Sequence, residues 1–129
     1  DDPDYAFILQ TAINEVRGEL TVGISEDGRD AIEQLKLFSE NKVKPKLILL
    51  DLNLPGLSGL DVLKTIKEMP YLKYTPVILF STSDHPNDVK ASYEFGANAY
   101  VTKPDGYYNL VECLKNMHDF WFVQNRALN

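Results

Sequence analysis

The feature that most constrains the fold of this chain is a repeated alternation between short apolar runs and stretches with apolar residues at helical spacing. The predicted strands lie within residues 19–28 and at 46–51, 76–81 and 98–104. The predicted helices cover 5–16, 29–40, 58–69 and 87–95, and a last helix begins at about Tyr107. Strands that alternate with helices are joined by right-handed crossovers into a parallel sheet. The sequence therefore predicts an α/β fold, a doubly wound parallel sheet with helices on both faces.

The apolar pattern also predicts which side chains are buried. The runs "KLILLD" (46–51) and "PVILFS" (76–81) show no alternation with polar residues, which is typical of strands buried on both faces. The helical residues expected to face the core are Ile32, Leu35 and Phe38, then Leu60, Leu63 and Ile66, and finally Leu110, Val111, Leu114, Met117 and Trp121.

The start of the chain is unusual for such a sheet. It begins with an acidic cluster, Asp1 and Asp2, followed by a helix, with no strand before it. A doubly wound sheet usually opens with its central strand. We therefore expect that an apolar strand precedes Asp1 in the natural protein and is missing here. A true four-stranded sheet is the alternative.

Composition limits the classes of function. The chain has 129 residues, 44% of them hydrophobic, which fits a single domain. A net charge of -6 argues against nucleic acid or an anionic membrane as the partner, and no apolar segment has the length of a membrane span. The single Cys113 favours a cytoplasmic setting, and one cysteine with two histidines argues against a zinc site.

Polar residues stand at the ends of three predicted strands: Asp51, Ser81 and Lys103. Asp1 and Asp2 stand where the missing strand would end. Sites in open parallel sheets form beyond the carboxyl ends of the strands, so these positions are expected to converge at one edge. Taken alone, each is an ordinary turn or strand-end residue; together they favour a functional site.

The residue types suggest the chemistry of that site. Crowded carboxylates favour a hard divalent cation such as Mg²⁺, and a carboxylate beside Mg²⁺ can attack a phosphoryl group. Asp51 would be the nucleophile, Lys103 a second positive charge and Ser81 a hydroxyl donor to a phosphoryl oxygen. A turn with Pro55, Gly56 and Gly59 follows Asp51, and its backbone N–H groups would donate as well.

Several segments resemble one known family. "DDPD", "LILLDLNLPGLSGLDVL", "PVILFSTS", "GANAYVTKP" and the closing helix are similar to the receiver domains of two-component response regulators, over essentially the whole chain. The resemblance implies a flavodoxin-like fold with strand order 2-1-3-4-5. It also implies a receiver domain over residues 1–129 that takes a phosphoryl group from a sensor histidine kinase or phosphotransfer protein. Because a short tail follows the last helix, no output domain is expected.

The resemblance assigns the metal ligands and the phosphoacceptor. Asp51 falls on the phosphoacceptor, and Asn53 on the position whose backbone carbonyl binds Mg²⁺ and which lines the phosphate site. The family ends its first strand with an acid pair. On that pattern Asp1 is the second acid and the metal ligand, Asp2 is the variable residue after it and a weaker candidate, and the first acid is absent.

The same resemblance assigns the switch. Ser81 falls on the hydroxyl switch residue, Thr82 on the small phosphate-binding residue after it, and Tyr100 on the aromatic that turns inward when the hydroxyl moves to the phosphoryl group. Lys103 falls on the family's invariant lysine. The proline after it, Pro104, usually follows a cis peptide bond in the family.

The segment "HDFWF" (118–122) is the candidate output surface. Because neighbours on a helix differ by about 100°, Phe120, Trp121 and Phe122 cannot all face one core. A homodimer through the face made by the fourth helix, the fifth strand and the last helix, including Phe120 and Trp121, is one possibility, as in small regulators that partner bacterial phytochromes. A frayed helix end covering its own loop is the alternative.

Other functions are less compatible with the sequence. A receiver-like module that binds partners without phosphorylation remains the main alternative. A haloacid dehalogenase-type phosphatase would need a second aspartate where Asn53 stands, and a flavodoxin would need a phosphate loop after its first strand. His85 and His118 are expected at the surface or in packing, and no enzyme activity is expected beyond the protein's own phosphorylation and dephosphorylation.

Overall fold

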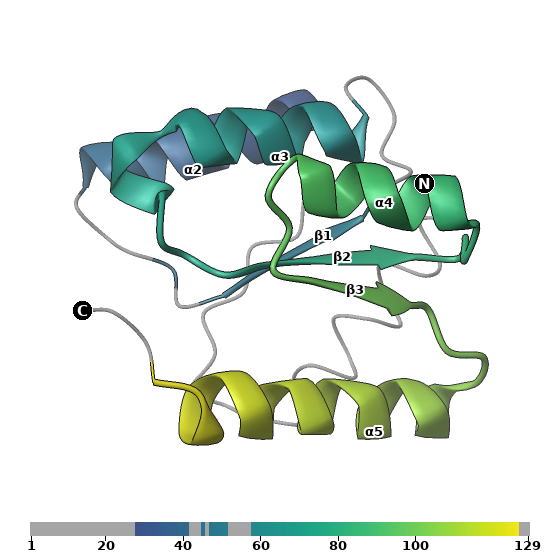
Figure 1. Ribbon diagram of the computed structural model, residues 1–129. Helices are drawn as coiled ribbons and strands as arrows, with labels where there is room; N and C mark the ends of the chain where they lie inside the picture. The colour runs from purple at the N-terminus through teal and green to yellow at the C-terminus, as the bar shows by residue number, and fades with distance from the viewer. Residues whose placement is uncertain (1–27, 42–44, 46, 52–57, 127–129) are drawn as a thin grey trace. The chain divides into compact units, whose positions relative to one another are not determined.

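The computed structural model describes residues 28–41, 45, 47–51 and 58–126 (Figure 1). Its helices are α2 (Gly28–Glu40), α3 (Gly59–Glu68), α4 (Pro86–Glu94) and α5 (Tyr107–His118), with a 3₁₀ turn η1 (Pro70–Leu72) and a π-helical turn η2 (Asp119–Gln124). Its strands are β1 (Ile48–Asp51), β2 (Val77–Ser81) and β3 (Ala99–Thr102). The predicted helix at 5–16 and strand within 19–28, and the side chains of Phe38 and Phe122, lie outside the described part.

The described strands form a parallel sheet in the order β1-β2-β3. This is the order predicted for the strands at 46–51, 76–81 and 98–104. In the first ladder Leu50 pairs with Leu79, and in the second Phe80 pairs with Val101. The three helices α2, α3 and α4 lie on the same side of this sheet (Figure 1). The alternation of strands and helices thus gives the parallel α/β arrangement that the sequence predicts.

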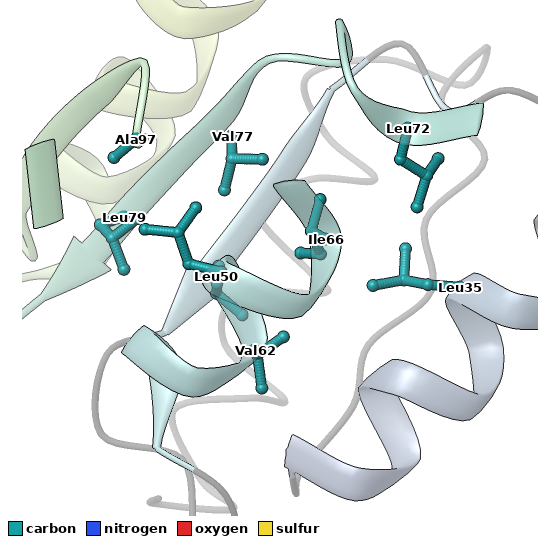
Figure 2. Packing of buried hydrophobic residues seen from close by; sticks show 9 residues of the cluster. Leu35, Leu50, Val62, Ile66, Leu72, Val77, Leu79 and Ala97 are labelled. Carbon is teal, nitrogen blue, oxygen red and sulfur yellow. The ribbon is translucent and has the colours of Figure 1, made fainter. Parts of the chain in front are cut away.

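A buried cluster fills the space between the sheet and its helices (Figure 2). It is made of Leu35 from α2, Leu50 from β1, Val62, Leu63 and Ile66 from α3, Leu72 from η1, Val77 and Leu79 from β2, and Ala97. All five residues of β2 are buried, as predicted for a strand covered on both faces. β1 is less buried than predicted: of its four residues only Leu50 is buried, and the other three are half-buried. Among the described strands, β2 is the one that pairs with β1.

Local chemistry sets the ends of the helices. Ser58 is the N-cap of α3, and its side chain accepts the Asp61 N–H at 3.2 Å. Met69 leaves the helix in an extended conformation, because the residue before Pro70 is disfavoured from helical geometry. α4 begins at Pro86, one residue before the predicted start. Proline fits the first position of a helix, because the N–H that it lacks would have no partner within the helix there.

The strand observed in the region 98–104 is shorter than predicted. β3 covers only Ala99–Thr102, and Pro104 has no N–H to give to a strand ladder. Asn98 stands just before the strand, where its side-chain oxygen accepts the Val77 N–H at 2.9 Å and the Lys67 ammonium at 3.1 Å. Lys67 also donates to the Thr75 carbonyl at 3.3 Å. These bonds tie α3 to the beginnings of β2 and β3.

The described chain forms two compact units, one ending at Thr102 and the other beginning at Lys103. The second contains α5 and η2, where Leu110 and Leu114 are buried and Val111, Met117 and Trp121 are half-buried. Of the residues predicted to face the core from α5, the two leucines are therefore the most buried. That residues 1–129 act as a single receiver domain stays a prediction.

Candidate functional site

Asp51 and Ser81 end neighbouring strands at the same edge of the sheet. Asp51 is the last residue of β1 and pairs with Phe80, the residue before Ser81. Ser81 is the last residue of β2 and is fully buried, whereas Asp51 is half-buried. Parallel strands present their carboxyl ends at one edge, so the two strand ends are adjacent, as predicted, while the convergence of the side chains on one site stays a prediction. Their chemical roles stay predictions.

Lys103 follows β3 directly. Thr102, the last residue of that strand, is the register partner of Ser81. Lys103 is the next residue along the chain and belongs to the second unit, so its approach to Asp51 stays a prediction. One expectation here is wrong: the described residues contain no cis peptide bond, and the Lys103–Pro104 bond is trans. An X–Pro bond has only a small intrinsic preference between the two forms, so the surrounding chain decides it.

The loop after β2 carries a hydrogen-bond network that begins at Ser81. The Ser83 N–H donates to the Ser81 Oγ at 3.1 Å. The Tyr100 hydroxyl donates to the Ser83 carbonyl at 2.7 Å. The Tyr100 ring is half-buried and packs against the buried cluster. The proposed hydroxyl switch and the proposed switch aromatic are therefore linked through one residue, Ser83, while Thr82 is exposed.

Ser83 and Asp88 were not identified from the sequence. The Ser83 hydroxyl donates to the Asp88 Oδ2 at 2.6 Å, and its Oγ accepts the His85 N–H at 3.2 Å. The signal that could have identified them is the polar run "STSDHPND" (81–88), because serines and aspartates around the start of a helix commonly hydrogen-bond to nearby backbone and side chains.

The two histidines occupy structural positions. His85 is exposed and is the N-cap of α4, where its Nδ1 accepts the Asn87 N–H at 3.1 Å. His118 is half-buried at the end of α5, with its Nδ1 3.3 Å from the Asp119 Oδ1. Both positions agree with the surface or packing role predicted for them.

Part of the predicted site lies outside the described residues. This holds for Asp1, Asp2 and Asn53, and for Pro55 and Gly56 in the turn after Asp51. Gly59 is described and is the buried first residue of α3. Within the described ranges, no group of three or more histidine, cysteine or acidic residues could hold a metal ion. The predicted metal ligands thus depend on Asp51 together with residues not described.

The segment "HDFWF" exposes an aromatic side chain. Phe120 is 51% exposed, as its position off the α5 stripe predicts, while Trp121 is half-buried. The two rings meet edge to face, with centroids 5.0 Å apart, which is a favourable aromatic geometry. Val123 on the same turn is also exposed.

Among the described residues, no helix has the length and apolarity to cross a membrane.

Comparison with known proteins places these observations in a family. The family model described as "Response regulator receiver domain" matches residues 1–115. The chain is 45% identical over 82 residues to response regulator Rcp1 of Synechocystis sp., an alignment that covers 64% of this chain and 56% of Rcp1. The chain therefore spans little more than half of that relative.

Two solved structures are similar along the whole chain. The phosphorylated cyanobacterial phytochrome response regulator RcpA is 33% identical, with a TM-score of 0.89, over 100% of this chain and 94% of RcpA. The Mn²⁺-bound form of Rcp1 is 33% identical, with a TM-score of 0.82, over the same shares of the two chains. The chain therefore belongs to the response regulator receiver domains of two-component signalling, with their doubly wound, flavodoxin-like fold, and it resembles the regulators of phytochromes.

Proposed function

We propose that this protein is a phosphorylation-activated signalling switch whose phosphoacceptor is Asp51. The observation that carries the proposal is the position of Asp51 and Ser81 at the carboxyl ends of adjacent parallel strands, one residue apart in register. A carboxylate at that edge is held by the sheet while its oxygens can meet a partner protein. The membership of the chain in the receiver family supports the same role.

The reaction is a transfer of a phosphoryl group from a phosphohistidine. An Asp51 carboxylate oxygen attacks the phosphorus, the N–P bond of the donor breaks, and its electron pair returns to the imidazole nitrogen. The products are an acyl phosphate on Asp51 and a free histidine. Because such transfer depends mainly on in-line positioning and charge neutralisation, the residues around Asp51 chiefly orient the phosphoryl group and balance its charge.

The oxygen donors of the site suit a divalent cation. Asp51 supplies a carboxylate, and Asp1 and the Asn53 carbonyl, which lie outside the described residues, would complete a set of the hard ligands that Mg²⁺ prefers. Bound Mg²⁺ would neutralise charge on the phosphoryl oxygens. The Mn²⁺-bound form of Rcp1 supports a divalent metal in this family.

The remaining site residues would bind the phosphoryl oxygens. Lys103 would supply a positive charge, the Ser81 hydroxyl would donate a hydrogen bond, and Asn53 and Thr82 would line the phosphate site. A phosphoryl group adds about -1.5 to -2 charges at neutral pH. Movement of Ser81 toward it would be passed to Tyr100, which already shares the Ser83 network with Ser81.

The partners follow from the family. The donor would be a sensor histidine kinase or a phosphotransfer protein, and the similarity to RcpA suggests a kinase of the phytochrome type. The output would be a partner protein or a second copy of the chain, bound through a surface that includes Phe120 and Trp121. The protein would act in the cytoplasm and would catalyse only its own phosphorylation and dephosphorylation.

Intact-mass spectrometry of the protein after incubation with acetyl phosphate tests the proposal. One phosphoryl adduct is expected in the presence of Mg²⁺, and none after chelation of the metal. The Asp51→Asn variant, which keeps the shape of the side chain but not its charge, should form no adduct. Failure of the wild-type protein to form an adduct would instead favour a module that binds partners without phosphorylation.

A further inference from the structure

Ser83 is contacted from three different elements. Its N–H donates to Ser81 at the end of β2, its carbonyl accepts from Tyr100 of β3, and its hydroxyl donates to Asp88 in the first turn of α4. The separations are 3.1, 2.7 and 2.6 Å. A single loop residue therefore connects the proposed hydroxyl switch, the proposed switch aromatic and the following helix.

The bond between Ser83 and Asp88 is the strongest of the three by chemical type. A hydroxyl that donates to an ionised carboxylate makes a short, charge-assisted hydrogen bond, and 2.6 Å lies in the range of such bonds. Asp88 is in turn fixed to its helix, because its backbone carbonyl accepts the buried Ser92 hydroxyl at 2.8 Å. The loop is thus attached to a position on α4 that is itself held in place.

This bond is not needed to begin the helix. His85 already caps α4 by accepting the Asn87 N–H, and Pro86 occupies the first helical position. The Asp88 N–H donates to the His85 carbonyl. The Ser83–Asp88 bond therefore adds a connection between the helix and the loop beyond what the cap provides.

We propose that Ser83 and Asp88 form a latch that positions Ser81 and Tyr100 for the phosphorylation reaction, an inference that rests on the proposed function of Asp51. The latch holds the Ser83 N–H against the Ser81 oxygen. That contact occupies a lone pair of Ser81 and leaves its hydroxyl hydrogen for a phosphoryl oxygen. The same latch fixes the Ser83 carbonyl that receives the Tyr100 hydroxyl. Ser83 and Asp88 are positioning residues, since they act through Ser81 and Tyr100.

The test compares four variants with the wild-type protein. Ser83→Ala removes the latch, Ser83→Thr keeps the hydroxyl, and Asp88→Asn keeps an acceptor oxygen but not its charge. Asp84→Asn removes a charge from the same loop at an exposed position and is the matched control. The rate of phosphorylation by acetyl phosphate is measured by intact mass, and the ring signals of Tyr100 are followed by NMR in the unphosphorylated protein.

The latch predicts an order of effects. The Ser83→Ala variant should be phosphorylated about five- to tenfold more slowly, a change of the size produced by loss of one hydrogen bond of ordinary net strength. The phosphorylation rate of the Asp88→Asn variant should lie between those of Ser83→Ala and the wild type. The rate of the Ser83→Thr variant should equal that of the wild type. The Tyr100 signals should shift in Ser83→Ala and Asp88→Asn but not in Asp84→Asn.

Two results would overturn the latch. One is a phosphorylation rate in Ser83→Ala and Asp88→Asn within twofold of the wild type, and the other is Tyr100 signals that do not change. If the wild-type protein takes up no phosphoryl group, the proposed function fails, while the Tyr100 signals still decide whether Ser83 and Asp88 hold the loop. A general loss of folding in Ser83→Ala would appear as altered signals throughout the protein, and Asp88→Asn would then decide the question.

Discussion

At the scale of single residues, Lys67 brings a positive charge into a partly buried position. Its ammonium donates to the Thr75 carbonyl and the Asn98 side chain, and burial lowers the pKa of Lys67 below its usual value. The native state therefore binds this proton less tightly than the unfolded chain does. The contribution of Lys67 to stability should rise with pH from its native pKa up to the ordinary lysine pKa of about 10.4.

Urea unfolding at neutral pH and near pH 10 checks this prediction at Lys67. The difference in unfolding free energy between the wild type and Lys67→Met should move in favour of the wild type as the pH rises. Other titrating groups are common to both proteins and cancel in the difference. A difference that stays constant, or moves toward Lys67→Met, would show that burial does not control this lysine.

At the scale of secondary-structure elements, two glycines with positive φ border the helices. Gly96 follows α4 with φ of 104°, and Gly106 precedes α5 with φ of 86°. A Cβ at Gly96 would lie 3.1 Å from the Lys67 Cγ, whereas one at Gly106 would have no heavy atom within 4 Å. Both glycines have a positive φ, which disfavours any residue with a Cβ, and they differ in packing.

Alanine at these glycines should separate the two costs. Gly106→Ala should lower the free energy of unfolding by about 1–3 kcal/mol, because φ of 86° with ψ of 147° is a backbone conformation that residues with a Cβ rarely adopt. Gly96→Ala should carry an added cost, because Lys67 must also move. Thermal or urea unfolding measures both substitutions, and in a Lys67→Ala background the cost of Gly96→Ala should fall. An unchanged cost there would contradict the role of Lys67.

At the scale of the whole molecule, exposed apolar side chains on η2 are the candidates for the proposed output surface. Phe120 is 51% exposed and Val123 is 66% exposed. Contiguous exposed apolar patches commonly mark interaction sites. If the chain self-associates through this surface, light scattering over a concentration series should show a dimer, and Phe120→Glu should shift it to the monomer.

The matched control for the dimer is Tyr74→Glu. Tyr74 is 64% exposed but lies between η1 and β2, so its change should leave the dimer intact. A monomer at every concentration in the wild-type protein would remove self-association as the output. Equal effects of the two substitutions would show that the surface around Phe120 is not specific.

Local sequence patterns predicted the main helices and strands of the described residues and the sheet edge that holds the proposed site. The uninterrupted run at 76–81 predicted a strand that is in fact buried throughout, and the apolar spacing at 58–69 predicted α3, although Val62 is more buried than Leu60. Asp51 and Ser81 could be identified because a polar residue at the end of a buried strand is a local signal, and parallel topology fixes which ends meet.

The hydrogen-bond partners of these residues, in contrast, depend on the folded chain. The hydrogen bond between Tyr100 and Ser83 joins residues 17 positions apart, and that between Lys67 and Asn98 spans 31. Such pairs depend on strand register and helix placement, which no short stretch of sequence contains. The trans bond before Pro104 likewise could not be predicted from the sequence. The cis and trans forms of an X–Pro bond differ little in intrinsic free energy, so the folded surroundings decide between them. Periodic burial is encoded locally, whereas hydrogen-bond partners distant in sequence are set by the fold.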